Sequence, residues 1–346
     1  MRYQIEAERR LRVGIVGVGS HAYRNILPTL SYLPAELVAV ADIDTARAEK
    51  VARQFGAGGV YETADAMFAN EDLEAVLLVV SAQLHPQLAI AAFACGLHVY
   101  LEKPAATRIV EVEQMLAART DRVCVVGYKK AFMPATRKAL EICSAPENQP
   151  LRSMVGIYPI SLPEDVIDLI EASQHNAWLA NGCHPLSALL TIGGPASAVT
   201  MHRGRHDGGA AVIEHRNGAL STLHLAAGAP LSQPVERYFA VAGDSSVEIV
   251  NSRELIHQRG IDFNYSHGTS YVDGQGARVW AAENHLNSPE NMAIMTQGLF
   301  GGLEHFFDCA LSSTPASIGT LEFALHLTRV WEAVAYSRGE KILIPG

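Results

Sequence analysis

The chain lacks an excess of basic residues. Of its 346 residues, 27 are lysine or arginine and 36 are aspartate or glutamate, which gives a formal net charge of -9 with neutral histidines. Proteins that bind nucleic acids or anionic membranes usually present a basic patch or stripe. The composition therefore argues against both, and we expect neither nucleic acid nor a membrane among the partners.

Long apolar runs are also missing. The longest, such as residues 75–80, are far below the roughly 18 residues that a membrane span needs. The opening MRYQIEAERR is too polar for the apolar core of a secretory signal. We therefore expect a soluble, cytoplasmic protein.

Cysteines are few and show no metal-binding or disulfide spacing. The five are Cys95, Cys124, Cys143, Cys183 and Cys309. Their number is odd and no two form a C-x-x-C pair, which argues against a disulfide framework and against a structural zinc site. We expect buried free thiols and no metal site.

The length suggests about two domains, and the first shows the alternation of a doubly wound fold. From Leu11 to about Val126, short apolar runs alternate with helix-like segments, the pattern of beta-alpha-beta units and a parallel sheet. The expected strands are residues 12–16, 36–41, 75–80, 98–101 and 123–126. Expected helices are residues 46–55, with Asp44 as N-cap, and 86–95, ended by Gly96. We assign residues 1–127 to a dinucleotide-binding Rossmann domain.

After Gly127 the pattern changes to strands joined by turns. A helix is expected over 134–143, and Asn217-Gly218 predicts a hairpin between residues 212–216 and 219–225. Further predictions are a turn at 206–209, strands at 237–242, 247–250 and 254–258, loops or short strands over 264–291, and closing helices at 299–311 and 320–337. We assign residues 128–346 to an α+β domain with a mainly antiparallel sheet, for substrate binding and oligomerisation.

A glycine-rich turn follows the first expected strand. In GIVGVGSHA, Gly17, Gly19 and Ala22 form G-x-G-x-x-A. Gly17 permits the tight turn, Gly19 leaves room for a pyrophosphate, and Ala22 allows close packing of helix on strand. Asp42 ends the second strand 20 residues after Ala22, where a carboxylate would bind ribose hydroxyls. Asp42 could otherwise be a helix-entry residue, but the joint pattern predicts a dinucleotide site.

Beyond that turn, the sequence resembles the Gfo/Idh/MocA oxidoreductases, the family of glucose-fructose oxidoreductase and inositol dehydrogenase. The resemblance rests on GIVGVGSHA, on VSAQLHPQLAIAAFACGLHVYLEKPAA and on GYKKAFMP. Weaker similarity continues in NGCHPLSALLTIGGP, AGDSSVEIV and SRGEKILIP. It implies a Rossmann domain followed by a domain whose open sheet covers the nicotinamide and often packs against another subunit, as a homodimer or homotetramer. The substrate it implies is a sugar, a cyclitol or a derivative.

The resemblance also assigns site residues. Lys103 matches the lysine of the family's Glu-Lys-Pro triplet, and His184 matches the histidine of its G-x-H segment. Lys103 also follows an expected parallel strand, at the sheet edge where such folds bind ligands. His184 could instead be a structural residue at the start of a helix. The expected cofactor-binding residues are Gly17, Gly19, Ser20, His21, Ala22, Asp42, Ser81, His85, Glu102 and Lys103.

Oxidation of an alcohol by hydride transfer needs a base for the hydroxyl proton and a donor that orients the oxygen. Lys103 and His184 can supply these groups. The family commonly has an aspartate four residues before the histidine and another three after it, whereas this chain has Ala180 and Ser187. The imidazole therefore lacks the expected carboxylate. Other polar residues that could enter the pocket are Asn181, which cannot carry a proton, and Asp168, Glu171 and His175.

These observations predict an NAD(P)-dependent oxidoreductase acting on CH-OH groups. Two alternatives are an NAD-retaining glycoside hydrolase or lyase that uses transient oxidation, and a non-catalytic family member. NAD is expected rather than NADP, because Asp42 and Asp44 would repel a 2′-phosphate and no arginine follows directly. Arg47, one helical turn on, is the side chain that could bind such a phosphate.

Overall fold

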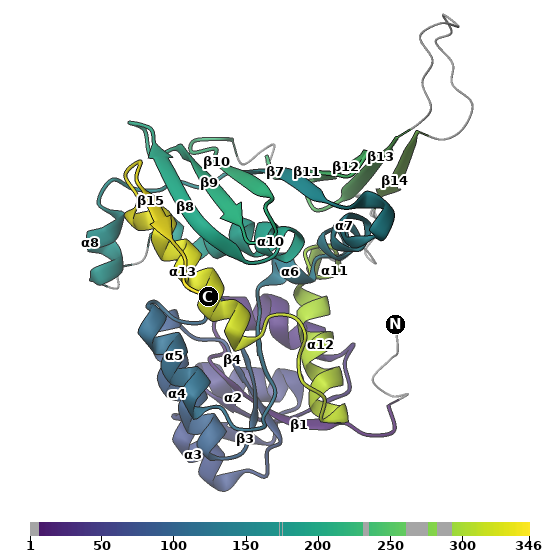
Figure 1. Ribbon diagram of the computed structural model, residues 1–346. Helices are drawn as coiled ribbons and strands as arrows, with labels where there is room; N and C mark the ends of the chain where they lie inside the picture. Colours follow the sequence, from purple (N-terminus) through teal and green to yellow (C-terminus); the bar gives the residue numbers. More distant parts are fainter. Residues whose placement is uncertain (1–6, 173, 175, 231–234, 261–275, 282–292) are drawn as a thin grey trace, which may run out of the picture. The chain divides into compact units, whose positions relative to one another are not determined.

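The computed structural model describes all residues except 1–6, 173, 175, 231–234, 261–275 and 282–292 (Figure 1). The chain forms two compact units: Met1–Phe132 with Gly298–Thr328, and Met133–Gln297 with Arg329–Gly346. Gly298–Thr328 thus lies in the first unit, although the sequence pattern placed it in the second domain. The domain boundary at residue 127 stays a prediction.

A six-stranded parallel sheet forms the centre of the first unit. Its strand order is β3-β2-β1-β4-β5-β6, the order of dinucleotide-binding folds. The strands are β1 (Leu11–Val16), β2 (Ala35–Ala41), β3 (Gly59–Tyr61), β4 (Ala75–Leu78), β5 (His98–Leu101) and β6 (Cys124–Val126). Strands β1, β4 and β5 are apolar and buried along nearly their whole length, as expected for a sheet covered on both faces. The predicted parallel sheet is confirmed, and β3 is a further edge strand.

Helices cover both faces of this sheet. In Figure 1, α3 (Ala64–Asn70), α4 (His85–Ala94) and α5 (Ile109–Ala118) lie on one side, and α12 (Leu299–Ser312) lies on the other. The remaining elements are η2 (Ala22–Ile26), α1 (Leu27–Leu30), α2 (Thr45–Phe55), η3 (Ala82–Leu84), α6 (Lys129–Phe132) and the first part of α13 (Leu321–Tyr336). Asp44 caps α2 by accepting the Arg47 N–H at 3.0 Å, and Gly96 follows α4 with φ +73°. Both predicted helix ends are therefore confirmed.

The second unit contains a nine-stranded open sheet in the order β14-β13-β12-β11-β7-β10-β9-β8-β15. Only β7 and β10 pair in parallel, which confirms a mainly antiparallel sheet. The strands are β7 (Leu151–Tyr158), β8 (Ala196–Arg203), β9 (Gly209–His215), β10 (Leu220–Leu225), β11 (Arg237–Ala242), β12 (Ser245–Val250), β13 (Glu254–Arg259), β14 (Ala277–Ala281) and β15 (Lys341–Leu343). The hairpin predicted at Asn217-Gly218 joins β9 to β10, with Gly218 at φ +88°. Strand β14 lies within the segment 264–291, most of which is outside the described residues.

Helices α7 and α10 pack against one face of this sheet, α7 on β12 and β13 and α10 on β7 and β10. The helical elements of the unit are α7 (Pro134–Ser144), η4 (Pro146–Asn148), α8 (Val166–Glu171), α9 (Ala177–Asn181), α10 (Cys183–Gly193), α11 (Ala293–Thr296) and the rest of α13. Because side chains alternate along a strand, the residues between those that touch these helices point to the other face.

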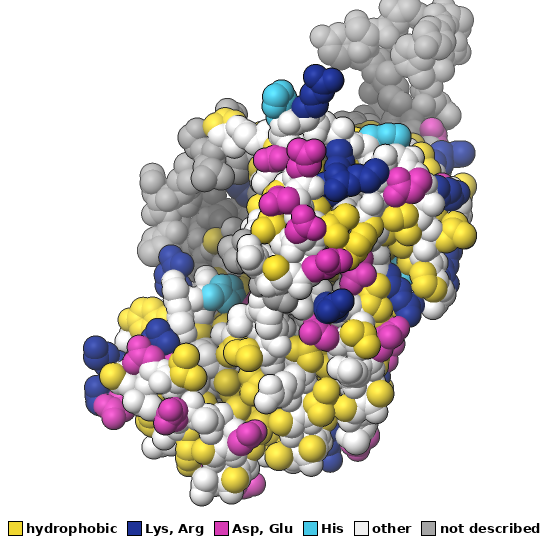
Figure 2. Space-filling view, turned by 90° about the vertical axis from the view of Figure 1, so that its left-hand side faces the viewer, with side chains coloured by type: hydrophobic (Ala, Val, Ile, Leu, Met, Phe, Trp, Pro, Cys, Tyr) yellow, Lys and Arg dark blue, Asp and Glu magenta, His cyan; other side chains and the backbone are white. Residues whose placement is uncertain are grey.

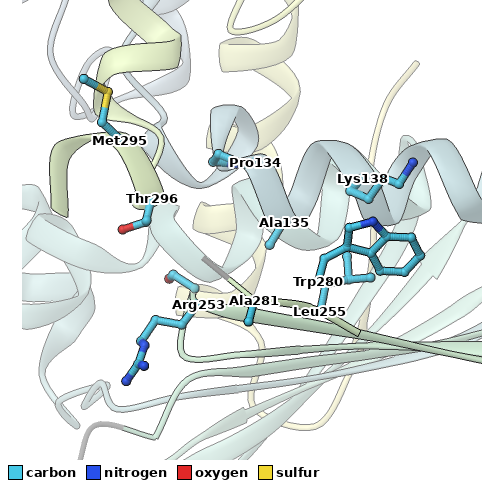
Figure 3. Close-up of a pocket in the computed structure, with 10 residues that line it drawn as sticks. Pro134, Ala135, Lys138, Arg253, Leu255, Trp280, Ala281, Met295 and Thr296 are labelled. Atoms are coloured by element: carbon cyan, nitrogen blue, oxygen red, sulfur yellow. The ribbon is translucent and has the colours of Figure 1, made fainter. Parts of the chain in front are cut away.

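The described surface carries charges of both signs. On the face drawn in Figure 2, acidic, basic and apolar side chains are interspersed. Within the described ranges no helix is long and apolar enough to cross a membrane. The same part of the chain holds no group of three or more histidine, cysteine, aspartate or glutamate side chains placed to bind a metal ion.

Candidate dinucleotide and active site

The glycine turn after β1 has the backbone geometry that its sequence predicts. Gly17 has φ +86°, and a Cβ atom there would collide with the carbonyl of Val79, which directly follows β4. Only glycine fits such a position. A Cβ atom at Gly19 would meet no atom within 4 Å, so the backbone is open there to an approaching phosphate. Ala22, fully buried, begins the helical segment that follows.

A cavity of about 700 Å³ opens beside this turn. It is lined by Gly17, Gly19, Asp42 and Ser81, which brings together four of the residues predicted to bind the cofactor. Apolar atoms from the ends of β2 and β4 and from α4 form much of the remaining wall: Ala41, Ile43, Val79, Val80, Leu84, Leu88 and Ala91. The size and mixed lining suit a nucleotide, whose base is apolar on its faces and whose ribose and phosphates are polar.

Asp42 is held firmly at the mouth of this cavity. Its Oδ2 accepts the Val18 N–H at 2.8 Å, and its Oδ1 accepts the Asp44 N–H at 2.9 Å. The guanidinium of Arg47 donates to the same Oδ1 at 2.7 Å. Burial acts to raise the pKa of Asp42, but Arg47 and the two backbone donors together hold that pKa below its usual value. Asp42 is therefore an ionised acceptor, and Arg47 occupies part of its hydrogen-bonding capacity.

The Glu102-Lys103-Pro104 triplet follows β5 at the same edge of the sheet. Glu102 is buried, and its Oε2 accepts the Lys103 N–H at 3.2 Å. His21 Nε2, from the glycine turn, lies 3.3 Å from Glu102 Oε1. Burial acts to raise the pKa of Glu102, but His21 and Lys103 keep it below its ordinary value. The buried carboxylate thus ties the glycine turn to the loop that carries Lys103, whose side chain is half-buried.

His85 supports that loop from beneath. Its ring is fully buried at the start of α4, and Nδ1 lies 2.9 Å from the carbonyl oxygen of Pro104. Burial lowers the pKa of His85, which favours the neutral ring with Nδ1 as the donor. The Lys103-Pro104 peptide is cis. The structure therefore shows His85 positioning the loop, while a direct contact with the cofactor stays a prediction.

His184 lies in the second unit, on a helix that runs along a strand. A Cβ atom at Gly156 of β7 would be 3.2 Å from Leu189 of α10. His184 comes five residues before Leu189 on α10, and Tyr158 comes two residues after Gly156 on β7. The rings of His184 and Tyr158 lie 6.3 Å apart between centroids, at an angle of 51°. Five helical residues advance about 7.5 Å and two strand residues about 6.6 Å, so the contacts of α10 with β7 recur at matching positions.

The positions where the family commonly has aspartate hold no carboxylate. Ser187 is fully buried, and its hydroxyl donates to the backbone carbonyl of His184 at 2.9 Å. Ala180 is half-buried on α9, and Asn181 beside it is exposed. Asp168 and Glu171 are exposed on α8. His175 lies outside the described residues.

Sequence reasoning missed Tyr158, the ring that lies beside His184. Tyr158 is the last residue of β7, and nothing in the local pattern distinguishes it from other strand residues. Its role emerges only from the packing of α10 on β7. The pairing of Arg47 with Asp42 was equally invisible, because a side chain one helical turn away can point in several directions.

Comparison with known proteins identifies the first unit. Residues 11–129 match the model of the GFO_IDH_MocA family, described as an oxidoreductase family with an NAD-binding Rossmann fold. The chain is 35% identical over 138 residues to inositol 2-dehydrogenase of Acidothermus cellulolyticus (37% of this chain, 39% of that protein). It is 30% identical over 151 residues to an uncharacterised oxidoreductase, ORF334, of Rhizobium meliloti (43% and 45%). These matches span less than half the length of either relative.

The similarity of fold extends over both units. A structure of levoglucosan dehydrogenase in complex with NADH and levoglucosan superposes with a TM-score of 0.81 at 18% identity, covering 98% of this chain and 100% of that one. The predicted fold class, a Rossmann domain followed by an α+β domain with an open sheet, is thereby confirmed. The glycine turn, the ionised Asp42 and the family model lead to one conclusion: residues 11–129 form an NAD-binding Rossmann domain that matches the model of the Gfo/Idh/MocA oxidoreductase family.

Proposed function

We propose that the protein is an NAD-dependent oxidoreductase that transfers a hydride between nicotinamide and a secondary alcohol or ketone of a sugar, a cyclitol or a sugar derivative. The observation that carries this proposal is the first unit's sheet edge, where a nucleotide-sized cavity and the Glu102-Lys103-Pro104 loop follow neighbouring strands. The named activities of inositol 2-dehydrogenase and levoglucosan dehydrogenase support the substrate class.

The residues present fit the cofactor. The open backbone at Gly19 and the N–H groups that follow would hold the phosphates, and Asp42 would accept a ribose hydroxyl. Ser81 lies on the cavity wall, within the same site. NAD, when bound, supplies the hydride acceptor. NAD is the preferred form in this proposal, because Asp42 is ionised and would repel a 2′-phosphate.

Lys103 is the acid–base group in this proposal. An amine is a suitable acceptor for the hydroxyl proton when a neighbouring positive charge lowers its basicity. The loop that carries Lys103 is fixed by the buried Glu102 and by His85, so the lysine starts from a defined backbone position. His184 would act as a hydrogen-bond partner that orients the substrate oxygen, because neither Ala180 nor Ser187 offers its imidazole a carboxylate.

One experiment separates this function from the alternatives. Purified protein is mixed with NAD and, in turn, with myo-inositol, D-xylose and levoglucosan, and both nicotinamide reduction and sugar products are followed. Net reduction identifies a dehydrogenase. A cleaved or dehydrated product without net reduction identifies an NAD-retaining hydrolase or lyase. Tight binding of NAD without any turnover across a wider sugar panel would indicate a non-catalytic member.

We also propose that the open face of the nine-stranded sheet binds a second copy of the chain. Gly156 touches α10, so its neighbour Val155 points to the opposite face, where it pairs with Phe239 of β11. Val155 is 40% exposed and Phe239 is 38% exposed, an unusual state for large apolar side chains at the centre of a sheet. Sedimentation of the wild type and of Phe239→Glu tests this: the wild type should be a dimer or tetramer and the variant a monomer. A monomeric wild type would contradict it.

A further inference from the structure

A carboxylate, that of Glu236, lies on the helix-facing side of the sheet, beside Tyr158. Arg237 of β11 pairs with Ile157 of β7, so Glu236, one residue earlier, lies opposite Tyr158. Tyr238, two residues after Glu236, is on the same face and is almost fully buried. Tyr158, Glu236 and Tyr238 therefore form one polar cluster at the end of β7, beneath the start of α10.

Glu236 is anchored through both its backbone and its carboxylate. Tyr238 donates its hydroxyl to Oε1 at 3.1 Å, and Ser252 donates to Oε2 at 3.2 Å. The Glu236 N–H donates to Asn251 Oδ1 at 2.9 Å, and its carbonyl accepts the Asn251 N–H at 2.8 Å. These hydrogen bonds thus hold the Glu236 side chain in one conformation.

The turn that supplies three of these contacts has a left-handed backbone. Asn251 has φ +50° and Ser252 has φ +59°, the left-handed region that few residues other than glycine adopt. Both residues direct polar atoms at Glu236, and Ser252 is buried. Two successive left-handed residues are the usual geometry of a tight hairpin turn, and this turn between β12 and β13 presents both polar groups to Glu236.

Tyr158 links this cluster to His184. Its ring packs against the imidazole, with centroids 6.3 Å apart. Burial, the negative charge of Glu236 and the nearby Cys183 raise the pKa of Tyr158 well above its ordinary value. The phenol therefore remains protonated and can donate a hydrogen bond at any physiological pH.

We propose that Glu236, acting through Tyr158, positions His184 and replaces the carboxylate that residues 180 and 187 do not provide. This inference rests on the proposed function only in assigning His184 to the active site. Glu236 and Tyr158 are positioning residues in it. Among the residues that the structure describes, Tyr158 packs against His184, and the charged or titratable groups that act on the Tyr158 phenol are Glu236 and Cys183, with Tyr238 on the same face of the sheet.

Nuclear magnetic resonance of protein with isotope-labelled histidine tests the proposal without any substrate. The His184 signal is assigned by its loss in His184→Asn and is then followed as the pH changes. A nearby negative charge stabilises the imidazolium, so Glu236→Gln should lower the His184 titration midpoint by roughly 0.5–1 pH unit, as expected for one charge several ångströms away at intermediate dielectric. Glu248→Gln is the matched control. Glu248 lies on β12 and its side chain pairs with Arg237 of β11, so this change should leave the His184 midpoint unchanged.

Tyr158→Phe decides whether the effect passes through the phenol. In that background the His184 chemical shifts should change, and Glu236→Gln should move the His184 midpoint less than it does in the wild-type background, because only the direct effect of the charge remains. An unchanged midpoint in Glu236→Gln, or a His184 that stays neutral across the whole range in the wild type, would overturn the proposal. If Glu236→Gln fails to fold, a His184 midpoint and chemical shift in Tyr158→Phe that match the wild type would overturn it equally. Because the apo protein is measured, the result does not depend on whether the protein is a dehydrogenase.

Discussion

Lys103 is the residue on which the proposed chemistry depends most. Its loop is fixed by contacts of Glu102 and His85 with the backbone, which a change in the lysine side chain leaves in place. We expect Lys103→Ala to lower kcat by about 100- to 10,000-fold, the usual contribution of general acid–base catalysis, with folding and NAD binding preserved. Steady-state kinetics and an NAD titration check this, with Lys50→Ala, an exposed lysine of α2, as the control. A near-normal kcat would remove Lys103 from the mechanism.

His184 should matter less than Lys103. The loss of one positioning hydrogen bond to a neutral partner costs about 0.5–1.5 kcal/mol, or roughly two- to thirteenfold in rate or affinity. We expect His184→Asn to keep measurable activity, with the loss largely in KM and with a pH profile still governed by one lysine-like ionisation. A fall in kcat as large as that of Lys103→Ala, or the disappearance of a limb near pH 6–7, would identify His184 as the base.

We expect Arg47 to affect the choice between NAD and NADP. Asp42 Oδ1 already accepts hydrogen bonds from Asp44 and Arg47, so a ribose hydroxyl must use Oδ2 or displace the guanidinium. The guanidinium is also the nearby group that could offset the repulsion between Asp42 and a 2′-phosphate. We expect wild type to prefer NAD. In Arg47→Ala we expect NADP to bind at least about tenfold more weakly and NAD to change by less than about threefold.

Titration of both cofactors into wild type, Arg47→Ala and Arg53→Ala measures this effect. Arg53 is the matched control, because it lies on the same helix and pairs with Glu49 instead. Tighter binding of NADP than NAD by the wild type would contradict the role of Asp42. Unchanged NADP binding in Arg47→Ala would contradict the role of Arg47.

At the scale of elements, two tryptophans fix the start of α10. Trp178 and Trp331 each donate an indole N–H to the other's backbone carbonyl, at 3.3 and 3.1 Å, and their rings are nearly parallel. Gly182 lies against this pair, and a Cβ atom there would be 2.7 Å from the Trp178 carbonyl oxygen and 2.8 Å from Trp331 Nε1. The pair therefore sets where α10, and with it His184, begins.

Gly182→Ala should consequently destabilise the protein. Crowding of a rigid, buried site costs about 1–3 kcal/mol. Urea unfolding followed by tryptophan fluorescence measures the change, and Gly58→Ala is the control because a Cβ atom there meets nothing closer than 3.8 Å. Equal stability of the two variants would show that Trp178 and Trp331 can shift to accommodate the added methyl group at little cost in free energy.

At the scale of the whole molecule, buried histidines make stability depend on pH. Burial lowers the pKa of His85, His98, His215 and His257 below the ordinary value of 6.5. The unfolded chain therefore binds more protons than the folded one once the pH falls below that value. The stability from these groups is complete above about pH 6.5 and is lost as the pH falls toward the lower pKa values of the folded state.

The free energy of unfolding should accordingly fall between about pH 7 and pH 5. The carboxylates of Asp42, Glu102 and Glu322, whose pKa values are lowered, add their own loss only below their ordinary range near pH 4. Urea unfolding at intervals across this range checks the sign. Constant or rising stability from pH 7 to pH 5 would show that these histidines are protonated within the folded protein.

The sequence by itself determined the Rossmann half and its glycine turn. Apolar runs of strand length, the cap at Asp44 and the positive φ required at Gly17 are local properties, so short stretches of sequence specify them. The same holds for the Asn217-Gly218 hairpin, whose turn residues fix its register. The Glu102-Lys103-Pro104 triplet is also a local sequence pattern, and it lies within residues 11–129, which match the family model.

Tertiary structure decided what surrounds those signals. Packing places Gly298–Thr328 in the first unit. It also pairs Arg47 with Asp42 and brings Glu236 opposite Tyr158 on the neighbouring strand. Each of these depends on side chains that are distant in sequence or free to point several ways. Their positions follow from strand order and from helices packed in step with strands, which no local pattern of residues encodes.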